Sequence, residues 1–314
     1  MGSSLYLKSM EYIGHRHQAP NVVVTARNVR FESGKTTALI GPNGSGKSTL
    51  LSALMGFRSD FAMRASFAGH NYADGPPPDR HRIGFTSQSQ SFPPGVRVKD
   101  LVTFHRRVYG PFGAETASAV SDLVPSDLFD ISYDKLSGGQ KQRVNLYMAL
   151  GHLPDLALMD EPESSLDDKR IRSIARSIKA RATLSKTTLV ATHDAQILAT
   201  AENVVLMIAG EVSYQGTLQD LIAERLGQGA LEIVMDGEAE RRRLMPVLEK
   251  NTARKMQIEF EEGRLLLFGT NALQDVTKEP AFVEKRMGLT WRSLTPKDLL
   301  LSLDATCVPR SAAS

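Results

Sequence analysis

The sequence has a single cysteine, Cys307, among 314 residues. One cysteine cannot form an internal disulfide, and without a neighbouring cysteine at ligand spacing it does not indicate a metal site. We therefore expect a protein of a reducing compartment, with Cys307 an incidental residue of the C-terminal tail.

Long apolar runs are also missing. A membrane-spanning helix needs about 18 or more consecutive apolar residues, whereas the longest candidates are short stretches such as Val204–Ala209. The first five residues lack the charged start and apolar centre of a signal peptide. These absences predict a soluble protein that stays in the cytosol.

Charge of one sign is not concentrated anywhere along the chain. The 38 basic and 35 acidic residues leave a net charge of +3 and are mixed along the sequence. So mild a balance argues against nucleic acid or anionic lipid as a partner. The hydrophobic fraction of 41% is sufficient for an ordinary globular core, and the length allows one large domain and a smaller one.

Short apolar segments alternate with segments of helical spacing in the first two thirds of the chain. The segments expected as buried strands are Thr37–Ile40, Leu156–Met159 and Thr187–Thr192, and those expected as helices are Ser48–Met55 and Asp168–Arg181. This alternation predicts an α/β fold with a mainly parallel sheet covered by helices. A mostly helical stretch, about 96–124, predicts an inserted helical subdomain spanning about 92–150.

The pattern changes after Gly210. Strands are predicted at 231–235, 256–260, 264–268 and 289–294, and helices at 238–250 and 271–286. The order βαββαβ predicts a small α+β domain of the ferredoxin-like kind. We therefore place the domain boundary between 222 and 223, with 1–222 as the large domain and 223–314 as the small one.

One glycine-rich segment fits the phosphate-loop pattern G-x-x-x-x-G-K-[ST] in the required strand–loop–helix context. Its residues are Gly41, Pro42, Asn43, Gly44, Ser45, Gly46, Lys47 and Ser48, followed by Thr49. Small residues allow backbone N–H groups to surround phosphates, and the following helix directs its positive end at them. Lys47 is expected to neutralise the β- and γ-phosphates of ATP, and the Ser48 hydroxyl to bind Mg²⁺.

A pair of carboxylates follows the apolar segment 156–159. Asp160 ends that strand and is expected to hold Mg²⁺, through a water molecule. Glu161 is then positioned to polarise the attacking water as a general base. Two acids after a strand are by themselves common, but together with the phosphate loop they indicate nucleotide hydrolysis.

Leu136-Ser137-Gly138-Gly139-Gln140 resembles the signature pentapeptide of the ABC ATPase family. The glycines and Ser137 precede an apolar helix, so they form a second helix start able to bind an anion. In that family the surface closes over the ATP held by a partner chain. The resemblance, which covers about residues 5–220, therefore implies a P-loop ABC ATPase fold and two nucleotide-binding chains facing head to tail. A homodimer is expected, with a heterodimer as the alternative.

The remaining site residues are implied by the same resemblance. Gln88 matches the glutamine that contacts Mg²⁺ and water and communicates with the membrane subunit, with Gln90 as a rival. His193 matches the switch histidine at the γ-phosphate, and Asp167 the aspartate that crosses the dimer interface. Tyr12 is the candidate for stacking on adenine, with His15 and His17 as alternatives.

One position departs from the family pattern: Glu163 stands where threonine is commoner. The sequence offers no reason for this difference. Every catalytic position holds the expected residue type, so the resemblance predicts an active ATPase that uses ATP and Mg²⁺.

The function expected from the resemblance is ATP hydrolysis that drives a separate transmembrane permease, on the cytoplasmic face of the membrane. A groove near Gln88 and 92–108 is expected to receive a helix of the permease. The tail, from 216–221 through 293–300, looks like the accessory domain of bacterial drug and lipid exporter ATPases. It favours export, with uptake as the alternative.

Three other classes fit less well. A chromosome-maintenance or DNA-repair ATPase needs a long coiled coil or a large DNA-binding segment between phosphate loop and signature, where only about ninety residues lie. A ribosome-associated factor of the superfamily normally carries two cassettes. A P-loop GTPase or kinase would not need Leu136–Gln140, and the sequence has no Asn-Lys-x-Asp guanine motif.

Overall fold

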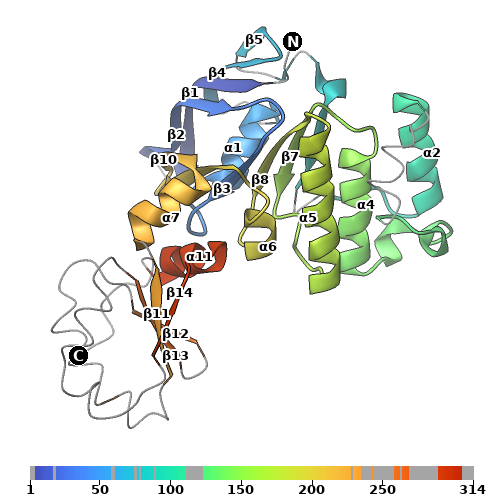
Figure 1. Cartoon of the computed structure of the whole chain (residues 1–314). Coiled ribbons are helices and arrows are strands. Elements are labelled where there is room, and N and C mark those ends of the chain that lie inside the picture. Colours follow the sequence, from blue (N-terminus) through green and yellow to red (C-terminus); the bar gives the residue numbers. More distant parts are fainter. Residues whose placement is uncertain are drawn as a thin grey trace. The chain divides into compact units, whose positions relative to one another are not determined.

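The computed structural model describes residues 4–16, 19–57, 61–73, 76–77, 79–87, 90–110, 123–227, 229–234, 242, 258–261, 264–268 and 289–305. The chain forms two compact units, 1–217 and 218–314 (Figure 1). The boundary predicted at 222/223 falls inside helix α7 (Leu218–Leu226), which starts the second unit. Within the described residues no helix is long and apolar enough to cross a membrane.

The described residues of the first unit form a ten-stranded sheet with the strand order β5-β4-β1-β2-β10-β9-β3-β8-β7-β6. Its strands are β1 (Leu5–Arg16), β2 (Ala19–Phe31), β3 (Thr36–Ile40), β4 (Phe61–Phe67), β5 (His70–Ala73), β6 (Ile83–Thr86), β7 (Leu156–Asp160), β8 (Thr187–Ala191), β9 (Asn203–Ile208) and β10 (Glu211–Thr217).

One half of this sheet is parallel. β9, β3, β8, β7 and β6 pair in parallel in that order. Every residue of β3, β7 and β8 is buried, as expected for parallel strands covered on both faces. Because parallel strands end at the same edge, the residues that follow β3, β7 and β8 are brought together there.

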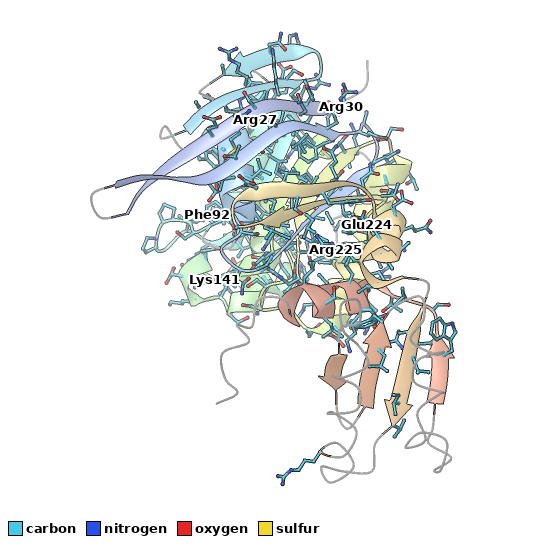
Figure 2. The ribbon with its side chains drawn as sticks, turned by 90° about the vertical axis from the view of Figure 1, so that its left-hand side faces the viewer. Arg27, Arg30, Phe92, Lys141, Glu224 and Arg225 are labelled. Atoms are coloured by element: carbon cyan, nitrogen blue, oxygen red, sulfur yellow. The ribbon has the colours of Figure 1, made fainter. Side chains whose placement is uncertain are left out.

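The other half is mainly antiparallel: β1 pairs with β2 and β4, β4 with β5, and β9 with β10, whereas β10 pairs with β2 in parallel. The sheet is therefore mixed, where a mainly parallel one was predicted. β2 buries Val29 and Phe31 and exposes Arg27 and Arg30 (Figure 2). Arg27 pairs with Glu11 of β1. Such half-exposed strands lack the continuous apolar run by which buried strands are recognised.

Helices cover the sheet and form the helical subdomain. They are α1 (Lys47–Leu54), α2 (Val98–Tyr109), α4 (Gly138–Leu150), α5 (Asp168–Thr183) and the short α6 (Ala195–Leu198), with 3₁₀ turns at Arg80–Arg82, Ser126–Leu128 and Tyr133–Lys135. Leu50, Leu51 and Leu54 of α1 pack in one core cluster with residues of β1, β2, β4 and β7. This core fixes the first turn of α1 against the sheet.

The second unit contains a four-stranded antiparallel sheet in the order β12-β13-β11-β14, with α7 and α11 (Pro296–Ala305). Its strands are β11 (Ala230–Val234), β12 (Ile258–Glu261), β13 (Arg264–Phe268) and β14 (Leu289–Arg292). β11 is antiparallel to β13 and β14, and β12 is antiparallel to β13. Consequently β11 and β12 run in the same direction with β13 between them, the arrangement of a split βαβ unit.

All four predicted strands of the small unit are present. The helices predicted at 238–250 and 271–286 lie, Arg242 apart, outside the described residues. Asp298 of α11 accepts two hydrogen bonds from the guanidinium of Arg292, at 2.8 and 2.7 Å, and one each from the backbone N–H and hydroxyl of Thr295. This buried carboxylate thus joins β14 to the start of α11.

Candidate functional site

The phosphate loop connects the end of β3 to α1. Gly41 and Gly46 have φ angles of 143° and 101°, in the region that only glycine adopts readily. A Cβ on Gly41 would lie 2.0 Å from the carbonyl oxygen of Met207, and one on Gly46 would lie 2.5 Å from Cγ2 of Val24. Both positions therefore require glycine, because of the backbone conformation and because neighbouring atoms leave no room for a Cβ. Gly46 is also the N-cap of α1, whose first N–H groups have no partner inside the helix.

Lys47 lies across this loop. Its Nζ donates to the carbonyl oxygens of Gly41 at 2.8 Å and Pro42 at 3.1 Å, and the residue is only 5% exposed. The loop and the first turn of α1 thus bring one fixed positive charge and several N–H donors to the same place. That combination suits a phosphate chain.

Ser48 and Asp160 form the oxygen pair that the sequence assigned to magnesium. The Ser48 hydroxyl donates to Oδ1 of Asp160 over 3.1 Å. Mg²⁺ binds oxygen ligands at 2.0–2.1 Å and usually keeps several water molecules. The Ser48 hydroxyl therefore suits direct ligation, and Asp160, which accepts its hydrogen bond, suits the contact through water expected from the sequence. Burial raises the pKa of Asp160, while the Ser48 hydrogen bond and the charge of Lys47 oppose that rise; a bound cation would keep the carboxylate ionised.

Glu161 and His193 meet at the edge where β7 and β8 end. His193 Nε2 lies 3.6 Å from Glu161 Oε1, and the Glu161 N–H donates to the carbonyl oxygen of Ala191 at 2.9 Å. Glu161 has a φ of 47°, an uncommon conformation for a residue other than glycine and one found at functional sites. The predicted base and the predicted switch histidine, 32 positions apart in the sequence, are therefore side by side.

Glu163, the residue without a sequence rationale, contacts the segment that carries His193. Its Oε1 accepts the Thr192 hydroxyl at 2.6 Å and the backbone N–H of His193 at 2.9 Å. Burial raises the pKa of this carboxyl, and the Thr192 hydrogen bond counteracts the rise. Glu163 thus holds the chain after β7 to the chain after β8. Sequence analysis missed this role because the sequence does not indicate which groups a single acidic side chain after a strand will bond.

Ser137–Gln140 form a second helix start, at α4. The Ser137 Oγ accepts the N–H of Gln140 at 3.3 Å, and the Gln140 Oε1 accepts the N–H of Ser137 at 2.9 Å, which is a capping box. A Cβ on Gly139 would lie 2.7 Å from the carbonyl oxygen of Ser165. Among the described residues, no hydrogen bond links this surface to Gly41–Ser48.

Asp167 begins α5, next to the signature surface. Its Oδ1 accepts the N–H of Arg170 at 2.9 Å and its Oδ2 pairs with the Arg170 guanidinium at 2.8 Å. The carboxylate is exposed. It can therefore cap its own helix and still lie at the surface where a second molecule would meet it.

Two predicted site residues lie outside what the structure describes. Gln88 belongs to the residues without a described structure, and for Tyr12 only the backbone is described, in β1 opposite Val24 and Phe61. Gln90, the rival of Gln88, is described. Its carbonyl oxygen accepts hydrogen bonds from the Tyr133 hydroxyl at 3.1 Å and the Asn145 amide at 3.2 Å, so it helps to hold the helical subdomain.

A cavity of about 860 Å³ connects the Ser48–Asp160 pair to a group of aromatic residues. Phe57 and Phe85 line it and contact each other edge-to-face, with ring centroids 5.0 Å apart. Phe57 is 60% exposed, so the aromatic end of the cavity lies at the surface. The cavity borders the groove predicted near Gln88 and 92–108: Ser87, Gln90, Ser91 and Tyr109 line it, but no residue of 92–108 does.

Comparison with known proteins assigns the family. Residues 24–164 match the family model described as ABC transporter. The probable sulfate/thiosulfate import ATP-binding protein CysA of Chlorella vulgaris is 33% identical over 202 residues, which are 62% of this chain and 84% of that protein. The chain belongs to the ABC transporter ATP-binding family. The resemblance drawn from the signature pentapeptide is thereby confirmed.

Other relatives of this ABC cassette differ in the direction that their names give. The Fe(3+) ions import ATP-binding protein FbpC 1 of Rhodococcus jostii is 35% identical over 223 residues, 67% of this chain and 63% of that protein. The Nod factor export ATP-binding protein I of Cupriavidus metallidurans is 29% identical over 242 residues, 74% of this chain and 79% of that protein. The chain thus spans less than two thirds of the length of the Rhodococcus relative.

A solved structure of a dimeric bacterial ABC transporter cassette has the same fold as the first unit. It matches with a TM-score of 0.59 at 23% identity, covering 68% of this chain and 98% of that one. The α/β ABC ATPase fold predicted from the sequence is confirmed, together with the small α+β unit after it.

Proposed function

We propose that this cassette binds ATP with Mg²⁺, hydrolyses it, and drives a separate transmembrane permease. The observation that carries the proposal is the grouping of Lys47, Ser48, Asp160, Glu161 and His193 at one sheet edge. Phosphoryl transfer to water requires positioned groups and electrostatic stabilisation. Lys47 supplies a positive charge at the phosphate loop, Ser48 and Asp160 supply oxygens for Mg²⁺, and Glu161 supplies a carboxylate beside His193.

Each side chain has a distinct task in this proposal. Lys47 neutralises charge on the β- and γ-phosphates, and Ser48 and Asp160 hold Mg²⁺. Mg²⁺ supplies further positive charge at the β- and γ-phosphate oxygens. Glu161 orients and polarises the attacking water, and His193 contacts the γ-phosphate from the neighbouring segment.

The signature surface implies a second molecule. Ser137–Gln140 present an exposed, capped helix start that makes no described hydrogen bond to the chain's own phosphate loop. A helix N-terminus of this kind suits the γ-phosphate of an ATP bound elsewhere. We therefore propose a head-to-tail homodimer with two shared ATP sites, in which Asp167 lies at the interface.

The aromatic cavity suits the permease. It joins the Mg²⁺ pair to Phe57 and Phe85 at the surface, so a helix of the permease seated there would sense the state of the nucleotide site. The aromatic pair Phe57 and Phe85 favours burial of an apolar helix face at this end of the cavity. This contact would keep the cassette at the cytoplasmic face of the membrane.

Replacing Phe57 with Asp tests this contact. The variant is expected to lose the permease in pull-downs from solubilised membranes, while ATP hydrolysis by the isolated chain stays within about twofold, because Phe57 touches none of the reacting groups. Trp291→Asp is the matched control, since Trp291 is a 44% exposed aromatic residue of β14 in the second unit and does not line the cavity. If a multi-span membrane protein identified by mass spectrometry co-purifies equally with both variants, the cavity is not its docking site.

For direction we propose export, as the tail suggested. The alignment with the Nod factor export protein covers more of this chain than the alignment with the Fe(3+) import protein. The higher identity of the import relatives favours uptake as the second candidate. ATP-dependent accumulation of radiolabelled Fe³⁺ or sulfate in right-side-out vesicles that carry the transporter, abolished by Glu161→Gln, would establish uptake and contradict export.

Glu163 is proposed as a positioning residue for His193. Glu163→Ala removes the acceptor shared by Thr192 and the His193 N–H, and the loosened segment is expected to lower kcat about tenfold with little change in the KM for ATP. Glu163→Gln keeps a carbonyl acceptor at the same place and is expected to retain most of the activity. Equal losses in the two variants, measured by steady-state phosphate release, would contradict this role.

A further inference from the structure

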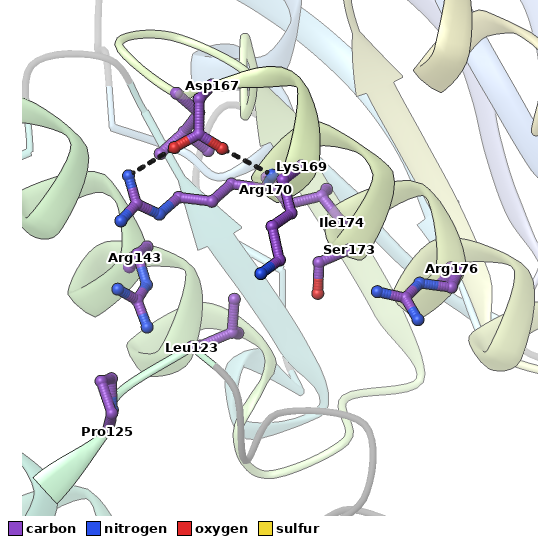
Figure 3. Close-up of a pocket in the computed structure, with 10 residues that line it drawn as sticks. Leu123, Pro125, Arg143, Asp167, Lys169, Arg170, Ser173, Ile174 and Arg176 are labelled. Atoms are coloured by element: carbon purple, nitrogen blue, oxygen red, sulfur yellow. Dashed lines mark hydrogen bonds and ion pairs between the residues drawn. The ribbon is translucent and has the colours of Figure 1, made fainter.

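A pocket of about 430 Å³ lies between α5 and the segment that leads to α4. It is separate from the phosphate loop, none of whose residues lines it. Three basic side chains of α5, Lys169, Arg170 and Arg176, and one of α4, Arg143, line this pocket (Figure 3). We call it the basic pocket.

The charge of the basic pocket is strongly one-sided. Among the described residues, four cations line it with a single carboxylate, Asp167, which is paired with Arg170 at 2.8 Å. Within the described part of the chain, no carboxylate lies in ion-pair distance of Lys169 or Arg176. The cassette as a whole has a net charge of only +3, so such a local excess is not a consequence of general basicity.

The donors around the pocket are of the types that recognise phosphate. Figure 3 shows the Lys169 ammonium, the Ser173 hydroxyl and the Arg176 guanidinium directed toward the same space. Arginine binds phosphate in a bidentate manner, lysine adds a point charge and a hydroxyl adds a neutral donor. The volume lies in the range of small-molecule sites.

We propose that the basic pocket binds a phosphate monoester, either a small phosphorylated metabolite or the headgroup of a phosphatidate lipid. Its apolar floor, which includes Leu123 and Ile174, accommodates the carbon part of the molecule. This site is separate from the phosphate loop and goes beyond the proposed transport function.

The position of Arg170 links the pocket to the dimer interface. The guanidinium that would contact the anion is the one that holds Asp167. A bound phosphate competes with the carboxylate of Asp167 for this cation, because both are anions that accept hydrogen bonds from the same guanidinium N–H groups. Occupancy of the pocket therefore alters the segment 164–167 and, through it, the rate of ATP hydrolysis.

Binding is tested by calorimetric titration of glycerol 3-phosphate into the full-length chain carrying Lys47→Ala, so that the phosphate loop contributes least. Lys169→Ala with Arg176→Ala in that background is expected to weaken binding at least tenfold, since two charge-assisted contacts are lost. Arg172→Ala with Lys179→Ala is the matched control, because these cations lie on the same helix but do not line the pocket. The control pair is expected to bind within about twofold of its parent.

A second arm separates the two sources of the phosphate. Flotation with vesicles containing phosphatidic acid, compared with vesicles of phosphatidylcholine alone, detects a lipid headgroup, and the Lys169→Ala/Arg176→Ala pair must abolish it. Absence of binding in both arms, or equal weakening by the two variant pairs, overturns the site. Binding of glycerol 3-phosphate that leaves the ATP hydrolysis rate of the chain with intact Lys47 unchanged overturns the link through Arg170.

Discussion

Replacing Glu161 with glutamine is expected to lower the rate of ATP hydrolysis by about 10²–10⁴-fold, the contribution typical of a positioned general base. The dissociation constant for MgATP is expected to change less than about threefold. Glutamine fits the same space beside His193 and makes the same backbone bond to Ala191, but it cannot accept a proton from water. Phosphate release and a fluorescent ATP titration measure the two quantities.

The control for Glu161→Gln is Asp168→Asn, which removes one exposed carboxylate from the first turn of α5. Like Glu161→Gln, it removes one negative charge, but Asp168 lies away from the sheet edge that carries the site. Its hydrolysis rate is therefore expected to stay near that of the parent. If Glu161→Gln hydrolyses ATP at the normal rate, another group activates the water and the assignment of the base is wrong.

Ser137→Arg is expected to abolish hydrolysis while leaving ATP binding intact. The substitution removes the cap of α4, which costs about 1 kcal/mol, too little to unfold a domain of this size. It also places a bulky cation where a partner's γ-phosphate would contact the helix start. The chain's own phosphate loop is untouched, so the affinity for MgATP is expected to remain within about threefold.

A matched control for Ser137→Arg is Ser126→Arg, an exposed serine at another short helical turn of the same subdomain. Its hydrolysis rate is expected to be close to that of the parent. Loss of ATP binding in Ser137→Arg would contradict the account, because it would place the signature surface and the phosphate loop of one chain at the same nucleotide.

The sequence predicted the parts of the fold in which local pattern and burial agree. β3, β7 and β8 are buried throughout, so their sequences contain the short apolar runs by which they were predicted. β2, β4 and β5 do not, since they belong to antiparallel pairs with an exposed face. The four strands of the small unit were found because Gly and polar residues separate them clearly.

The site was predictable where its residues are adjacent in the sequence and form a recognisable motif. The loop Gly41–Ser48 and the pair Asp160 and Glu161 are contiguous motifs. Glu163 and the basic pocket were not predictable, because each brings together residues far apart in the chain. Glu163 bonds to Thr192, and the pocket is lined by Arg143 of α4 together with residues of α5. Only the packing of β7 beside β8 and of α4 beside α5 reveals them.

The central claim is that each ATP site is completed by a second copy of the chain. Sedimentation of Glu161→Gln with saturating MgATP measures it most directly, because blocked hydrolysis preserves the closed state. The account predicts an ATP-dependent species of twice the monomer mass, which reverts to monomer when Ser137→Arg is added. A chain that stays monomeric with MgATP bound would contradict it.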